Sequence, residues 1–167
     1  MSISMYSALV PPAMHGLKAL SAILNKAAAH CEAHKIDPAA LLNSRLFPDM
    51  LPLTKQVQIA CDTAKGAVSR LAGTDTPSHP DTETTFEELQ ARINKTLDYL
   101  AGFKPEQIDG SEDRIVTMKV RDNTLEFKGQ QYLSGFVLPN FYFHVATAYG
   151  LLRHGGVELG KRDYLGA

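Results

Sequence analysis

The residue types best suited to chemistry gather around His144, a histidine with apolar neighbours in the aromatic-rich stretch 138–166. Asn140 precedes it by about one helical turn and Thr147 follows it by three residues, so the three side chains share one side of a helix. A half-buried imidazole with polar neighbours can bind a ligand or act as an acid–base group. It can equally be a structural residue at the edge of the core, bonded to a neighbouring helix, because buried polar groups need partners. Both interpretations remain open from the sequence.

Two further histidines, His30 and His34, have the four-residue spacing that lets imidazoles on one helix share a metal ion, and Cys31 lies between them. The pair also falls in the last turn of the first long helical pattern, where cationic side chains interact favourably with the helix end. No third ligand is identifiable, so we expect no metal here.

The two cysteines, Cys31 and Cys61, are expected to be reduced thiols in the core. An antiparallel pairing of the first two helices would leave them about 13 Å apart, too far for a disulfide. No nucleophile elbow or phosphate-binding loop is present. The glycine-rich basic tail 155–166 follows a helix instead of opening one, so we expect it to cap that helix and pack against the fold.

The elements that must position these residues are mainly helical. Apolar residues at helical spacing predict a first helix over 3–34, kinked or restarted at Pro11 and Pro12. Asp37 and Pro38 predict a short helical turn to residue 42, and a second long helix follows over 49–72. Residues 74–84 are a loop by composition.

A capping box at Thr85 and Glu88 opens a third amphipathic helix over 85–100. Residues 115–127 then alternate with period two around Asp122 and Asn123, which predicts a β-hairpin lying against the helices. A fourth helix begins near Gln130, covers 140–153 and ends at Gly155. The expected fold is therefore all-α, a four-helix bundle with a small β-hairpin between helices three and four.

Composition narrows the function classes. The chain has 167 residues and a net charge of −1 with no basic stripe, so we expect one domain over 1–167 and no nucleic-acid partner. No apolar run approaches the roughly 20 residues of a membrane span, and no charged segment precedes an apolar one as in a signal peptide. We expect a cytoplasmic protein without a membrane partner.

Three segments resemble an uncharacterised bacterial domain-of-unknown-function family within the DinB/YfiT-like four-helix-bundle superfamily, many members of which are regarded as metalloenzymes. The segments are LFPDMLPLTKQVQIACDTAKGAVSRLAG (46–73), TFEELQARINKTLDYL (85–100) and LPNFYFHVATAYGLLRHGGVELGKRDYLG (138–166). The resemblance covers nearly the whole chain and implies an up-down-down-up helix order.

The resemblance also implies where a metal would sit. Superfamily members typically use one histidine of helix two and two histidines four apart on helix four. His144 matches the first of that pair, but the second position is Ala148, and helix two offers only polar substitutes such as Asp49 and Gln56. One imidazole with distant carboxyl or amide groups falls short of a zinc or nickel site, so no metal and no cofactor are expected.

Two hypotheses follow. The first is a metal-free member that acts as a small-molecule-binding or interaction protein, expected to be a homodimer, with ligand contacts from His144, Asn140, Asp49, Gln56 and Tyr142. The second is a divergent metal-dependent enzyme of the thiol-transferase or hydrolase type, using His144 with polar groups of helix two. Whether the chain is an enzyme at all is left open by the sequence, and no catalytic residue is assigned.

Overall fold

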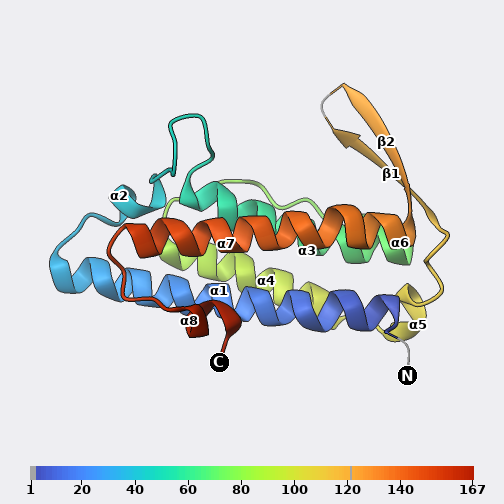
Figure 1. The fold of residues 1–167 in the computed structure, drawn as a ribbon, viewed down its shortest axis with the longest axis horizontal. Coiled ribbons are helices and arrows are strands. Elements are labelled where there is room, and N and C mark those ends of the chain that lie inside the picture. Colours follow the sequence, from blue (N-terminus) through green and yellow to red (C-terminus); the bar gives the residue numbers. More distant parts are fainter. Residues whose placement is uncertain (1–2, 121) are drawn as a thin grey trace.

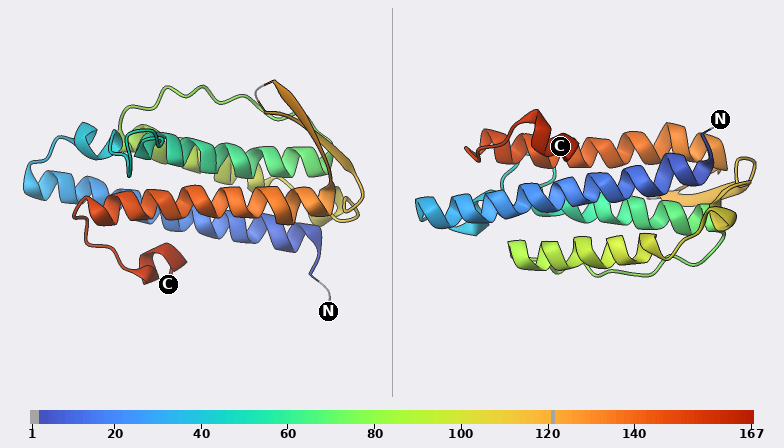
Figure 2. Two further views of the ribbon diagram at one scale, coloured as in Figure 1. Left: turned by 45° about the horizontal axis from the view of Figure 1, so that its top comes forward. Right: turned by 90° about the horizontal axis from the view of Figure 1, so that it is seen from below.

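The computed structural model describes residues 3–120 and 122–167, and its four long helices form a bundle (Figure 1). They are α1 (Met5–His34), α3 (Leu53–Ala72), α4 (Phe86–Ala101) and a continuous fourth helix that ends as α7 (Leu138–His154). α1 and α7 run in one direction and α3 and α4 in the other, the up-down-down-up order (Figure 2). Each of α1 and α3 packs against both α4 and α7. The predicted fold class is confirmed.

Helix α1 is more regular than predicted. Ser4 caps it in a reciprocal capping box with Ser7, and the helix continues unbroken through Pro11 and Pro12 instead of restarting there. Because proline has no N–H, the carbonyls of Ser7 and Ala8 lack their helical donors.

The connector between the first two long helices differs in one respect from the prediction. The short helix α2 (Pro38–Leu42) forms as expected, with Asp37 as its N-cap. Helix α3, however, begins at Leu53, so the predicted start near Asp49 was wrong. Pro52 is the N-cap residue, and the N–H of Leu53 bonds back to the carbonyl of Ser44, which closes a separate loop over 43–52.

The hairpin consists of β1 (Ile115–Val120) and β2 (Asn123–Lys128), preceded by the short helix α5 (Pro105–Ile108). Val120 pairs with Asn123, so Asn123 belongs to β2 and not to the turn, contrary to the prediction; residue 121 is outside the described residues. The hairpin packs against the core through Val116, Met118 and Phe127, but it also projects from the bundle, so its expected position against the helices is only partly present (Figure 1).

The fourth helix is built from three joined segments: α6 (Gly129–Gln131), a π-helix η1 (Tyr132–Val137) and α7. The π-helical turn lies directly before Pro139. There the N–H of Leu138 donates to the carbonyl of Leu133, five residues back. This wider turn lets the helix continue although Pro139 has no N–H to donate.

The aromatic-rich stretch forms much of the core, as expected, but not on all sides. Phe141, Val145, Ala148 and Leu152 are buried, whereas Tyr142 and Phe143 are 39% and 55% exposed. After Gly155 the tail runs back along α1 and forms the short helix α8 (Lys161–Leu165). In the tail Leu159 is buried and Leu165 is largely exposed, so the expected packing of the tail is present only in part. No helix within the described residues is long and apolar enough to cross a membrane.

Candidate functional site

His144 lies on the side of α7 that faces α3, and only 8% of its surface is exposed. Its Nδ1 lies 2.7 Å from Oε1 of Gln56, a buried residue in the first turn of α3. The side-chain amide of Gln56 donates in turn to the carbonyl of Leu51, at 2.9 Å. The structure thus brings together two of the predicted site residues, His144 and Gln56, through a direct hydrogen bond.

This arrangement determines the chemical state of the imidazole. Because the amide nitrogen of Gln56 donates to Leu51, its oxygen faces His144 and must receive a proton. His144 therefore carries its hydrogen on Nδ1 and keeps a lone pair on Nε2. Burial lowers the pKa of His144, which favours this neutral form.

Asn140 lies one turn before His144 on α7 and also faces α3. Its side-chain amide donates to the hydroxyl of Thr63 at 2.8 Å. The predicted grouping of Asn140 with His144 on one face is therefore present, but each side chain is bonded to a different residue of α3. Both bonds tie α7 to α3 in addition to apolar packing.

The other two predicted site residues lie elsewhere. Asp49 is exposed in the loop before α3, because the helix begins four residues later than expected. Tyr142 lines a cavity between α1, α7 and α8. It is two residues from His144, about 200° around the helix, so the two side chains point to different sides of α7.

The donor set between α3 and α7 does not suit the metal site of the superfamily. Gln56 stands on α3 against His144, with its oxygen already accepting the imidazole proton. Ala148 is fully buried and brings only a methyl group. Among residues 3–120 and 122–167, no group of three or more His, Cys, Asp or Glu side chains is placed to hold a metal ion. The residues present between α3 and α7 therefore do not fit a three-histidine centre.

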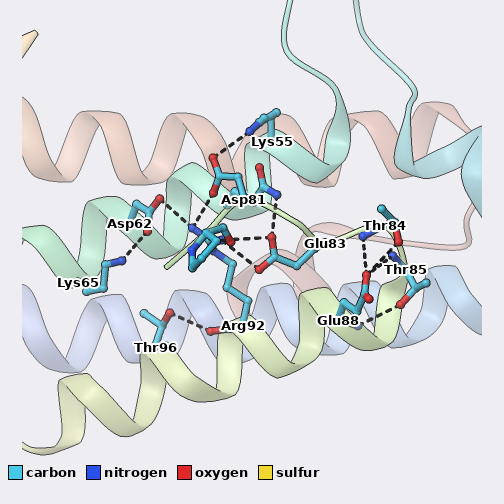
Figure 3. A network of polar contacts seen from close by, with 12 residues as sticks. Lys55, Asp62, Lys65, Asp81, Glu83, Thr84, Thr85, Glu88, Arg92 and Thr96 are labelled. Carbon is cyan, nitrogen blue, oxygen red and sulfur yellow. Dashed lines mark hydrogen bonds and ion pairs between the residues drawn. The ribbon is translucent and has the colours of Figure 1, made fainter. Parts of the chain in front are cut away.

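A second polar cluster, which the sequence analysis did not predict, surrounds Arg92 on α4 (Figure 3). The guanidinium is almost completely buried and makes ion pairs with Asp62 of α3 (2.8 Å), Asp81 (3.0 Å) and Glu83 (3.0 Å). It also donates to the carbonyl of Pro80, at 3.0 Å. Arg92 thereby fixes the connection 73–85, which returns along the whole bundle (Figure 2).

The cluster is electrically balanced. Each outer carboxylate has a second cation, since Lys65 lies 2.8 Å from Asp62 and Lys55 lies 2.8 Å from Asp81. Burial alone would raise the pKa of the Asp81 carboxyl, but the hydrogen bond from Lys55 and the charge of Arg92 bring it below its usual value. With three cations matching three carboxylates, the cluster holds the fold together and leaves no excess charge to attract an ionic ligand.

The cysteines do not form a nucleophilic site. Cys31 and Cys61 are both free and buried. Burial raises the pKa of Cys61 to about 12, so its thiol stays protonated and unreactive at neutral pH.

Comparisons with known proteins agree with this architecture. Residues 5–165 match the family model described as "Domain of unknown function (DUF1993)". The chain is 44% identical to a DinB family member protein from Shewanella denitrificans, whose crystal structure it resembles with a TM-score of 0.87 over 97% of this chain and 92% of that chain. None of the curated proteins matches the chain. The chain therefore belongs to the DUF1993 family of DinB-like helical-bundle proteins.

Proposed function

We propose that this DinB-like protein acts without a bound metal, as a protein that binds a small molecule or a partner. The hydrogen bond from His144 to Gln56 carries this proposal, because it occupies Nδ1 of His144 and the side-chain oxygen of Gln56 and leaves Nε2 of His144 as the one free donor atom of the pair. Ala148 adds to it, since an alanine cannot complete a histidine pair.

The first test is the metal content of protein purified without a histidine tag, compared with a His144→Ala variant. The proposal expects less than about 0.1 equivalent of zinc, nickel, iron or manganese in either protein. One equivalent of a transition metal in the wild type, lost in His144→Ala, would contradict it.

A divergent metal-dependent enzyme is the second candidate. One observation favours it: Nε2 of the neutral His144 keeps its lone pair, and no hydrogen bond to it is found within the described part of the chain. A single imidazole nitrogen supplies one of the three protein ligands that a catalytic zinc site uses, which is why this candidate ranks second.

We further propose that the protein is a homodimer that pairs through the exposed side of α7. Phe143 is 55% exposed, Ala146 is exposed, and a side chain added at Gly150 would meet nothing within 4 Å. Small residues beside an exposed aromatic ring allow two helices to approach closely.

Light scattering coupled to size exclusion tests the dimer. Phe143→Glu should convert it to a monomer, whereas Ile115→Glu, at an equally exposed position on the hairpin, should leave it intact. A monomeric wild type would contradict the pairing.

A further inference from the structure

A cavity of about 420 Å³ lies between α1, α7 and α8, on a different side of α7 from His144. Its size falls within the range of roughly 300–1,000 Å³ that is usual for small-molecule sites. The main lining residues are Pro11, Pro12, His15, Tyr142, Val145 and Tyr164. We name it the α8 cavity, because the short C-terminal helix forms one of its walls.

At the α8 cavity, helices α1 and α7 pack against each other through Gly16 and Phe141. Gly16 faces Phe141 there, and a Cβ at Gly16 would lie 2.8 Å from the phenyl ring. Val145 and the rings of Pro11 and Pro12 add further apolar surface. A ligand in this cavity therefore replaces water on carbon surfaces, which favours an apolar or aromatic body.

The polar groups of the lining include acceptors without a donor. The carbonyl of Ser7, another lining residue, has no helical donor because position 11 is a proline. His15 places Nε2 2.6 Å from the carbonyl of Leu165, so Nε2 carries a hydrogen, and the neutral form of this side chain presents Nδ1 as an acceptor. A ligand with an O–H or N–H group matches these acceptors.

The two tyrosines of the lining, Tyr142 and Tyr164, carry hydroxyl groups. Burial raises the pKa of Tyr164, and the proximity of Tyr142 raises it further. Their rings and hydroxyls can pack against an aromatic ligand and exchange hydrogen bonds with its polar group.

Helix α8 is attached by a few polar contacts and has no fully buried residue. Lys26 pairs with Asp163 at 2.6 Å, His15 bonds to Leu165, and Tyr164 packs edge-on against Tyr149 with ring centroids 5.9 Å apart. A short helix without a fully buried residue can move to admit a ligand without disturbing the bundle core.

From this geometry we infer that the α8 cavity binds an uncharged aromatic molecule that carries a hydrogen-bond donor, such as a phenol. The inference rests on the small-molecule role proposed above and specifies the site and the ligand class. It places binding away from His144 and Gln56, on the opposite side of α7.

The probe is p-cresol, with toluene as its partner lacking the hydroxyl. In NMR titrations of methyl- and amide-labelled protein, p-cresol should give saturable shifts at the Val145 methyl groups and the Gly16 amide. It should bind about tenfold more tightly than toluene, the effect of one hydrogen bond of about 1.4 kcal/mol. Tyr164→Ala should weaken p-cresol binding at least fivefold. Tyr149→Phe, which removes a hydroxyl outside the lining, should leave it unchanged.

Three results would overturn the inference. Saturable shifts centred on His144 and Gln56 would move the site while leaving the small-molecule role intact. Equal binding of toluene and p-cresol would contradict the assignment of the acceptors. Absence of saturable shifts anywhere, with p-cresol and with the larger 2-naphthol up to their solubility limits, would overturn the site and weaken the small-molecule role together.

Discussion

Nδ1 of His144 and Oε1 of Gln56 lie 2.7 Å apart and join α7 and α3, the two helices on which the superfamily resemblance would place metal ligands. Both side chains are more than nine-tenths buried, so neither can exchange this bond for one to water. The pair links α7 to α3 at the place where superfamily members are expected to bind a metal.

Removing either partner should therefore destabilise the fold. His144→Ala and Gln56→Ala should each lower the free energy of unfolding by about 1–3 kcal/mol, because each leaves a buried polar group without a partner. In a double-mutant cycle measured by urea unfolding, the coupling energy should be about 1 kcal/mol. Strictly additive losses would show that the hydrogen bond contributes nothing to stability.

The free energy of unfolding should depend on pH in part through the imidazole of His144. Burial lowers the pKa of His144, and burial with the charges of Lys65, Lys95 and Arg92 lowers that of His79. The unfolded chain then binds protons more readily, so stability is complete above a pH of about 6.5 and is lost as the pH falls through the folded-state pKa values.

We therefore expect the free energy of unfolding to decrease between pH 7.5 and pH 5.5, and to decrease less in His144→Gln. The acidic groups whose pKa values are lowered, such as Glu83, lose their contribution to stability only below about pH 4.5. They therefore do not affect the change in stability between pH 7.5 and pH 5.5. His79→Gln removes the other histidine contribution and serves as the comparison. If the free energy of unfolding changed with pH equally in His144→Gln and in the wild type, the lowered pKa of His144 would be contradicted.

How far the sequence predicts this structure depends on how local each signal is. The Thr85–Glu88 capping box was predicted and is confirmed, since its bonds span three residues. The start of α3 was not predicted correctly, because it depends on the bond from Leu53 to Ser44 across the connector. The π-helical turn before Pro139 likewise depends on how the fourth helix packs.

The candidate site shows the same division. Gln56 was identified as a polar neighbour of His144 only through the superfamily resemblance, and the structure adds the bond that joins them. Tyr142 could have been separated from His144 by helical geometry alone, since two residues correspond to about 200°. Arg92 could not have been found, because its partners in α3 and in the connection 73–85 meet only in the folded chain.

Arg92 should be the most sensitive charged residue of the fold. Arg92→Met removes the common partner of Asp62, Asp81 and Glu83 and should cost about 3 kcal/mol, near the lower end for broken buried pairs because two of the carboxylates are about 40% exposed. Arg92→Lys should lose less, although an ammonium group cannot reproduce the planar set of contacts.

Two measurements check this prediction. Urea unfolding gives the loss of stability, and limited proteolysis with endoproteinase Glu-C reports access to Glu83 in the connection. Unchanged stability and unchanged cleavage in Arg92→Met would show that the cluster does not fix the connection.

Two glycines of the fourth helix provide a matched pair. A Cβ at Gly129 would overlap the carbonyl oxygen of Ser111, whereas a Cβ at Gly135 meets nothing within 4 Å. Gly129→Ala should therefore lower the free energy of unfolding by about 2 kcal/mol or more, since backbone must move to make room. Gly135→Ala, measured in the same urea series, should cause no loss in the free energy of unfolding. Equal effects of the two substitutions would contradict the close approach at Gly129.

The central claim, that the pair His144–Gln56 replaces a metal site, is tested most directly by zinc titration of tag-free protein against a chromophoric chelator. His30→Ala is included throughout, because His30 and His34 have ring centroids 4.2 Å apart and can bind zinc weakly at the surface. For the protein with His30→Ala alone we predict no stoichiometric zinc binding. We predict a gain of one equivalent in Gln56→His/Ala148→His, which supplies the missing imidazoles. One equivalent bound by the His30→Ala protein and lost on adding His144→Ala would contradict the account.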